Sequence, residues 1–384
     1  MASAQAQIDR RCGPLRHTVI HGEAAAYCAH PHLAVAAEGT WLMVFNRAPR
    51  RAVVLHPPQD AAYQNMVMRS RDEGRTWSLP EAVPDESWTG VECAGLTPLP
   101  DGAVLLNQWR FDWVAPGAAA DAVAPEDLAR DWAASTEFDG LHADAQASRV
   151  QEQFPMARGG GTCWVHRAES PDASFTQSVR IDTGEYSGGY GMRDGVVLPG
   201  GRILLPLSDV PHYRSVFVVH SDDGGATWSP PALAAARPGC EFEEPAPIRL
   251  PDGRILMMLR ENRSRELHRV WSSDAGQSWS APQPTGIADY PADLLRLRDG
   301  RLALVAGRRR PPFGIALYLS DDDGESWGPP VAVRDDLPDR DLGYPSMAQR
   351  ADGDVVVVYY GRAADGVTSI WSTCVPAGVL DGLD

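Results

Sequence analysis

The 384-residue sequence contains no lysine, so all 35 of its strongly basic side chains are arginines. Schiff-base chemistry and P-loop phosphate binding both need a lysine, and both are therefore excluded. Negative charge predominates, with a formal net charge of −16, which argues against a protein that binds nucleic-acid phosphates. Arginine can bind a carboxylate through two parallel hydrogen bonds, so an acidic ligand fits this composition.

Cysteine is also sparse, and no long apolar run is present. The six cysteines show no metal-type spacing such as Cys-x-x-Cys, so we expect neither a metal nor a cofactor. No stretch approaches the length of a membrane-spanning helix, and the N-terminal segment lacks the apolar core of a signal peptide. We therefore expect no nucleic-acid or membrane partner and a cytoplasmic protein, unless a leader peptide was removed.

One eight-residue pattern, Ser-x-Asp-x-Gly-x-x-Trp, occurs four times. The four copies span residues 70–77, 221–228, 272–279 and 320–327. The Asp can close a turn onto nearby backbone N–H groups, the Gly permits positive φ, and the Trp can anchor the turn. Recurrence of a fixed pattern is typical of a repeat architecture.

A second pattern lies between these copies: two short apolar runs joined by Asp-Gly, Gly-Gly or Glu-Gly. Its turn pairs are Glu38-Gly39, Asp101-Gly102, Gly200-Gly201, Asp252-Gly253, Asp299-Gly300 and Asp352-Gly353. Such a pair between apolar runs predicts a β-hairpin. A third strand follows most hairpins and leads into the Ser-x-Asp-x-Gly-x-x-Trp pattern, which makes one four-stranded blade.

Six hairpins predict an all-β fold, a single six-bladed β-propeller that occupies residues 1–384. The segment GTCWVHRAESPDASFT, residues 161–176, carries a degenerate copy of the repeated pattern in blade two, with Asp172 and Phe175 in the Asp and aromatic places. The N-terminal HTVIHG segment is expected to supply the outer strand of blade six and close the ring. We interpret residues 111–160, after the blade-two hairpin, as a partly helical insertion over one face.

Strand order then predicts where chemistry can lie. Both the Asp-Gly turn and the repeated pattern must lie at one end of each blade, so the starts of the innermost strands converge at the other end. Counting back nine residues from each turn glycine gives His30, Cys93, Met192, Glu244, Pro291 and Tyr344. Counting forward seven or eight gives Arg47, Arg110, Arg260 and Arg308. A site of Glu, Tyr, His and Arg is predicted, although several of these arginines could instead form exposed salt bridges.

The Ser-x-Asp-x-Gly-x-x-Trp pattern resembles the Asp-box of sialidases and related β-propellers. The segment from Glu244 to Arg260 is similar to the sialidase segment with the catalytic Glu and the second Arg of a carboxylate-binding triad. Gly343-Tyr344-Pro345-Ser346 is similar to the stretch around the sialidase nucleophile. The resemblance implies that Tyr344 is the nucleophile and Glu244 its partner. It also implies that Arg260 and one of three consecutive arginines, Arg308, Arg309 or Arg310, bind a substrate carboxylate.

The resemblance has one departure. Sialidases begin blade one with Phe-Arg-Ile-Pro, whereas this sequence has Cys28-Ala29-His30-Pro31, so Ala29 replaces the first triad Arg. The acid/base residue is left open between Asp60 and His56, which lie in the expected loop.

Three functions follow from this sequence. The first is an exo-acting glycosidase that removes a terminal acidic sugar from an oligosaccharide or glycoconjugate, with Tyr344 as nucleophile. The second is a lyase acting at a uronic acid, in which Tyr344 or His30 abstracts a proton. The third is a propeller that binds glycans without catalysis, since fold does not determine function.

Overall fold

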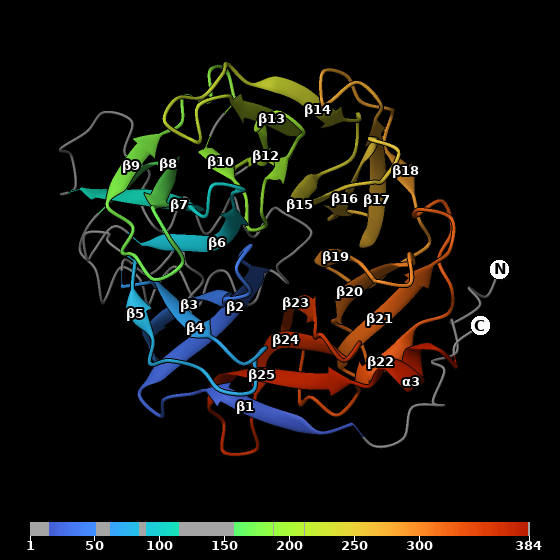
Figure 1. Ribbon diagram of the computed structural model, residues 1–384. Helices are drawn as coiled ribbons and strands as arrows, with labels where there is room; N and C mark the ends of the chain where they lie inside the picture. The colour runs from blue at the N-terminus through green and yellow to red at the C-terminus, as the bar shows by residue number, and fades with distance from the viewer. Residues whose placement is uncertain are drawn as a thin grey trace.

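The computed structural model describes residues 15–50, 62–83, 90–114, 157–186, 188–210 and 212–382. Within these ranges the protein is almost entirely β-structure, with 25 strands and one short helix, α3 (Ala377–Leu380). Figure 1 shows the sheets arranged around a common centre, as in a propeller. Within the same ranges, no helix is long and apolar enough to span a membrane.

Four sheets have four strands each and correspond to predicted blades one, four, five and six. Their strands are β2 (Ala26–Val35), β3 (Trp41–Pro49), β4 (Gln64–Ser70) and β5 (Glu81–Ala82); β15 (Phe242–Arg249), β16 (Ile255–Glu261), β17 (Glu266–Ser272) and β18 (Gln283–Pro284); β19 (Ala292–Arg296), β20 (Leu302–Arg308), β21 (Gly314–Ser320) and β22 (Val331–Arg334); and β23 (Gly343–Gln349), β24 (Val355–Arg362), β25 (Thr368–Val375) and β1 (His17–His21). β1 pairs with β25, with His17 opposite Thr373, as expected of a strand that closes the ring.

The remaining strands form one nine-stranded sheet. They are β6 (Val91–Pro98), β7 (Val104–Val114), β8 (Ala157–Ala168), β9 (Gln177–Arg180), β10 (Gly188–Tyr190), β11 (Val196–Val197), β12 (Ile203–Asp209), β13 (Ser215–Ser221) and β14 (Ala232–Ala236). The prediction of six separate four-stranded blades is therefore wrong: only four sheets are separate. The cause is β10, which pairs in parallel with β8 and antiparallel with β12.

Two glycines let β10 lie between β8 and β12. Gly188 and Gly189 have φ of 73° and 93°, and a Cβ on Gly188 would lie 3.1 Å from the carbonyl oxygen of Val210. A larger residue would be strained here both by its backbone conformation and by its neighbours. The fusion of the two sheets thus depends on a short Gly-Gly segment outside the repeated patterns.

The insertion is shorter than predicted at both ends. β7 continues to Val114 and β8 begins at Ala157, so the strands extend into both ends of the predicted 111–160 range. The expected helix falls within 115–156, outside the described residues.

All six predicted hairpin turns have the same hydrogen bonds. The N–H of the turn glycine donates to the carbonyl three residues before it, as from Gly253 to Leu250 at 3.0 Å. The six glycines have φ between 91° and 98°, a conformation that residues with a Cβ rarely adopt. The hairpin pattern read from the sequence is therefore confirmed.

The four Asp-boxes are also nearly identical, and they lie beside the hairpin turns as predicted. In the first, the Ser70 hydroxyl donates to Asp72 at 2.8 Å, and the N–H groups of Gly74 and Thr76 donate to Ser70 and Asp72 at 2.8 Å each. Ser70 is paired with Trp41, the first residue after the turn. Boxes also link neighbouring sheets, because Arg269 of β17 donates to the Gly324 carbonyl of the next box at 2.7 Å.

Candidate functional site

The starts of the innermost strands share an unusual backbone. His30, Glu244 and Tyr344 all have positive φ, of 55°, 53° and 45°, although none is a glycine. Each lies at a register shift in its strand, within 29–32, 243–246 and 343–346. A bulge turns a side chain away from the regular alternation of a strand, and strained conformations of this kind cluster at functional sites. Three of the six positions predicted by counting nine residues back, His30, Glu244 and Tyr344, are thus structurally equivalent.

At this end of the ring, Glu244 connects Tyr344 to Arg260. The Tyr344 hydroxyl donates a short hydrogen bond to Glu244 Oε1, and Arg260 Nη1 donates to Glu244 Oε2 at 3.1 Å. Arg260 Nε also lies 3.4 Å from Oε1 of Glu243. All four side chains are buried. A buried ion pair needs such additional hydrogen bonds to offset the cost of removing charge from water.

The Tyr344 phenol is protonated at neutral pH. Burial and the neighbouring Glu244 hold the pKa of Tyr344 well above its ordinary value, while Arg309 and Arg260 act in the opposite direction. Its proton is already directed at a carboxylate, so transfer to Glu244 needs no rearrangement. The Arg309 guanidinium lies over the Tyr344 ring, with Cζ 5.2 Å from the ring centre, which is within the range of a cation–π interaction.

The structure distinguishes the three consecutive arginines. Arg308 Nη2 lies 3.0 Å and Arg310 Nη1 lies 2.6 Å from opposite oxygens of Asp289, which is completely buried. Tyr318 donates to the same carboxylate at 2.6 Å. Arg308 and Arg310 therefore both bind Asp289, and the Arg309 guanidinium lies over the Tyr344 ring.

His30 lies against the tyrosine. The two ring centres are 4.4 Å apart with planes at 74°, and His30 Nδ1 lies 3.1 Å from Oδ1 of Asn46. The Tyr360 ring is 4.9 Å from His30 on another side. Residues at the starts of β2, β15 and β23, which are distant in the sequence, thus meet as the register predicted.

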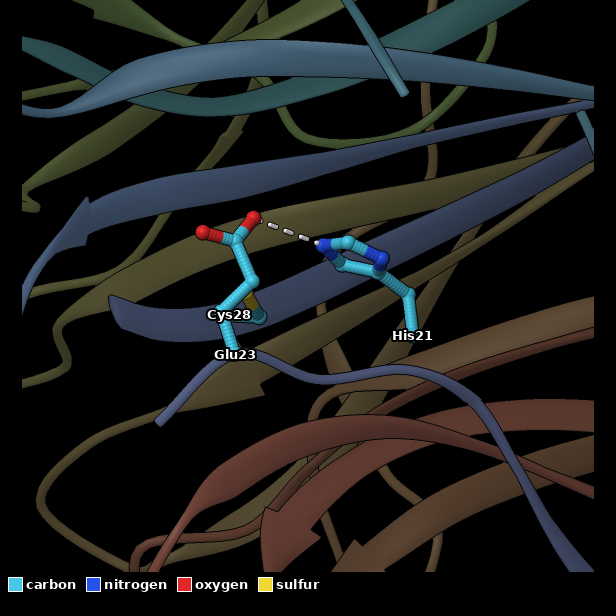
Figure 2. Close-up of side chains that lie close together, drawn as sticks. All are labelled: His21, Glu23 and Cys28. Carbon is cyan, nitrogen blue, oxygen red and sulfur yellow. Dashed lines mark hydrogen bonds and ion pairs between the residues drawn. The ribbon is translucent and has the colours of Figure 1, made fainter. Parts of the chain in front are cut away.

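Arg47 is part of a different group. Its Nε and Nη2 donate to the two oxygens of Glu23 at 2.9 and 2.6 Å. Figure 2 shows His21 directed at the same carboxylate, with Cys28 beside it. Among the described residues, His21, Glu23 and Cys28 form the group whose possible ligand atoms lie close enough together to hold a metal ion, all within 4.8 Å of one another. However, Arg47 already binds both Glu23 oxygens, and burial raises the pKa of the Cys28 thiol to about 12, so the set is poorly suited to a cation.

The outcome for two further predicted residues differs from these. Arg110 stacks over Trp164, with Cζ 5.2 Å from the ring centre. Asp60, like His56, lies outside the described residues, so its role stays a prediction.

Sequence reasoning missed several polar residues around the site. Glu243 lies 3.4 Å from Arg260, and its position next to Glu244 was the one sequence feature that could have indicated its place in the site. Asp341 accepts hydrogen bonds from Tyr27 at 2.8 Å and from Tyr360 at 3.1 Å, although nothing in its sequence neighbourhood indicates this. Asp289 likewise lies in an irregular segment outside both repeats.

Sequence comparisons relate this chain to proteins with BNR repeats and to sialidases. A family model described as "BNR repeat-like domain" matches residues 154–357. A sialidase of Clostridium perfringens is 24% identical over 233 residues, which are 59% of this chain and 55% of that protein. The chain therefore matches little more than half of this curated relative.

Two solved structures show the same fold. A Dyadobacter fermentans protein of unknown function aligns with a TM-score of 0.72 and 22% identity, over 93% of this chain and 97% of that one. The NanB sialidase of Streptococcus pneumoniae aligns with a TM-score of 0.67 and 13% identity, over 96% of this chain and 71% of that one. At these identities the likeness establishes the architecture, and the side chains must supply the argument about function.

Proposed function

This chain belongs to the family of BNR repeat-like domains, and we propose that it is a sialidase-like glycoside hydrolase that removes a terminal acidic sugar from a glycan. One observation carries the proposal: the hydrogen-bonded group of Tyr344, Glu244 and Arg260, built from two sheets. A phenol is a weak nucleophile unless a base takes its proton. Glu244 is placed to do so.

The chemistry follows from this contact. Tyr344 Oη attacks the anomeric carbon, its proton passes to Glu244, and the bond to the leaving glycan breaks as the glycan oxygen takes a proton from an acid/base side chain, which leaves a glycosyl–tyrosine intermediate. Water then displaces the tyrosine, gives its released proton to that acid/base side chain, and the tyrosine recovers its own proton from Glu244. Tyrosine is a known alternative to the carboxylate nucleophile of most glycosidases.

We propose that Arg260 and Arg309 recognise the acidic group of the sugar. Arg309 lies over the Tyr344 ring, and Arg260 donates to Glu244, the carboxylate that accepts the Tyr344 hydrogen bond. Arg308 and Arg310 instead bind Asp289, and Arg47 binds Glu23. Ala29 stands where sialidases have the first Arg of the triad. The clamp is thus smaller than that of a sialidase, and we propose an acidic sugar other than sialic acid as an equal candidate.

The test is hydrolysis of fluorogenic aryl glycosides of sialic acid and of uronic acids by the full chain and by Tyr344→Phe. Release of the free sugar by the wild-type protein and its loss in the variant are expected. If neither class of glycoside is cleaved, the hydrolase proposal fails.

A lyase acting at a uronic acid is the second candidate, because His30 lies against Tyr344 and either His30 or Tyr344 could abstract the proton in an elimination. The two reactions differ in their products. A lyase forms a conjugated, unsaturated uronate that absorbs ultraviolet light, whereas a hydrolase does not. Ultraviolet absorbance during digestion of a uronate-containing polysaccharide therefore separates them.

A further inference from the structure

A continuous chain of buried hydrogen bonds leads away from His30. His30 Nδ1 lies 3.1 Å from Asn46 Oδ1, Asn46 Nδ2 donates to Asn65 Oδ1 at 2.8 Å, and Asn65 Nδ2 donates to Gln108 Oε1 at 2.7 Å. Gln108 Nε2 lies 2.8 Å from His166 Nε2. Finally, His166 Nδ1 lies 2.7 Å from the hydroxyl of Ser178.

This chain of hydrogen bonds, from His30 to Ser178, crosses six strands in two sheets. Asn46 of β3 is directly opposite Asn65 of β4, and His166 of β8 is directly opposite Ser178 of β9. The step from Asn65 to Gln108 of β7 joins the first sheet to the nine-stranded sheet. The two asparagines, Gln108 and His166 have no solvent-exposed surface, whereas Ser178 is exposed. Side chains of this kind are rarely buried in a row without a specific role in structure or function.

The amide groups give the chain one direction. Asn46 uses its NH₂ toward Asn65, so its oxygen faces His30 and must accept from Nδ1–H. At the far end, Gln108 donates through its NH₂, so His166 accepts at Nε2 and donates from Nδ1–H to Ser178. Burial and the nearby Arg110 lower the pKa of His166 to about 4, so its ring is neutral and has one donor and one acceptor.

We propose that Asn46, Asn65 and Gln108 are positioning residues that hold His30 in the tautomer with hydrogen on Nδ1, so that Nε2 exchanges protons with the substrate beside Tyr344. This rests on the proposed function. In the second half of the hydrolase reaction, a water oxygen bonds to the anomeric carbon as the bond to Tyr344 Oη breaks. His30 Nε2 takes the proton that this water releases. The imidazolium so formed then protonates the leaving oxygen of the next substrate, which restores the neutral ring.

The tautomers can be read directly from nitrogen-15 spectra of protein labelled at histidine, because protonated and unprotonated ring nitrogens resonate far apart. Signals are assigned with His30→Gln and His166→Gln. In the wild-type protein, His30 and His166 are both expected to carry hydrogen on Nδ1. Hydrogen on Nε2 of His30 would overturn the proposal.

Asn46→Asp tests whether the chain is continuous. A carboxylate can only accept, so Asn65 and Gln108 must turn their amides, and His166 must move its hydrogen from Nδ1 to Nε2. Asn107→Asp is the matched control: Asn107 is a buried neighbour of Gln108 that donates to the Gly191 carbonyl at 2.7 Å, outside the chain. An unchanged His166 tautomer in a folded Asn46→Asp protein would contradict a continuous chain. If that protein does not fold, Gln108→Glu should produce the same switch at His166.

Asn46→Leu tests the effect on catalysis. It removes the acceptor of His30 Nδ1–H, so His30 should lose its single tautomer and kcat should fall at least ~10-fold with little change in KM. The melting temperature checks folding. A changed tautomer with unchanged kcat would overturn the role of His30 in proton transfer. If the wild-type protein cleaves no acidic glycan, the proposed function fails, while the spectra still decide on the chain.

Discussion

The two ends of the ring use one backbone repeat in opposite ways. At the turn end, formed by the hairpin turns and Asp-boxes, four copies repeat the same residues and nearly the same hydrogen-bond lengths. At the site end, formed by the starts of the innermost strands, the backbone conformation recurs while the side chain changes from His30 to Glu244 to Tyr344. Repetition of side chains therefore serves stability, whereas repetition of backbone with varied side chains assembles a site.

The pKa values of carboxyl groups also differ between the Asp-boxes and the rest of the ring. Hydrogen bonds from Thr227 and Ser221 lower the pKa of the Asp-box residue Asp223 to about 2. In the segment between β10 and β11, desolvation and the nearby Asp293 raise the pKa of Asp194 to about 7, although 43% of its side chain is exposed. The Asp-box therefore stabilises the negative charge of Asp223, whereas the surroundings of Asp194 disfavour a negative charge.

Loss of the Tyr344 hydroxyl should give the largest effect. Tyr344→Phe keeps the ring and removes the group that donates to Glu244, so kcat should fall on the order of 10²-fold or more with little change in melting temperature. Steady-state kinetics on an acidic glycoside and a thermal melt measure both. Tyr359→Phe is the control, because Tyr359 is a buried tyrosine of β24 whose hydroxyl lies 2.8 Å from Thr373. Equal activity of both variants would remove Tyr344 from the site.

The second prediction concerns the arginine of the site end. Arg260→Lys keeps the charge but loses the planar fork, so substrate binding should weaken by on the order of 1.5–3 kcal/mol, seen as a rise in KM. Arg263→Lys, in the exposed pair with Glu241 at 2.6 Å, should leave KM unchanged. A KM for Arg260→Lys equal to that of the control would show that Arg260 does not contact the substrate.

An Asp-box change should alter stability alone. Asp223→Ala removes the acceptor of the Ser221 hydroxyl and of Thr227 N–H, which should cost about 1–2 kcal/mol of unfolding free energy with kcat unchanged. Denaturant titration measures the loss. Asp222→Ala, one residue away in an exposed pair with Arg202, should cost less. A fall in kcat for a folded Asp223→Ala protein would contradict the interpretation that the turn end serves stability alone and the site end serves function.

The smallest effect is a difference in pH dependence. The pKa of Asp194 in the folded protein, about 7, is above the unfolded value of roughly 3.9, so its contribution to stability is present below that value and is lost as pH rises through about 7. Asp194→Asn should therefore melt at a higher temperature than wild type at pH above 7, with the difference vanishing toward about pH 4.

The groups that face Asp194 are His32, Arg193 and Asp293, and His32 is neutral because burial and Arg193 hold its pKa well below the ordinary value. Asp223 has the opposite sign: its contribution is present above roughly pH 3.9 and is lost as pH falls through about 2. Above about pH 7, the melting temperature of Asp194→Asn should be higher than that of wild type and the melting temperature of Asp223→Asn lower. The first difference should vanish toward about pH 4 and the second toward about pH 2. A parallel response of both variants would contradict the comparison.

Much of the fold was predictable because the repeats are local. A turn glycine, an Asp-box and the apolar runs between them specify their own hydrogen bonds, and the nine-residue spacing placed His30, Glu244 and Tyr344 at equivalent positions before any pairing was known. The fusion of two sheets through β10 was not predictable, because Gly188 and Gly189 belong to neither repeat.

The sequence by itself determined the β-architecture, the turns and the residue types available at the site end, since each depends on neighbours within one blade. Tertiary structure alone decided which of them act together. Asp289 binds Arg308 and Arg310, Arg309 lies over the Tyr344 ring, and the amides from Asn46 to Gln108 align across two sheets. These contacts join residues far apart in the chain, and side-chain direction at a bulge or in a loop follows packing rather than sequence spacing.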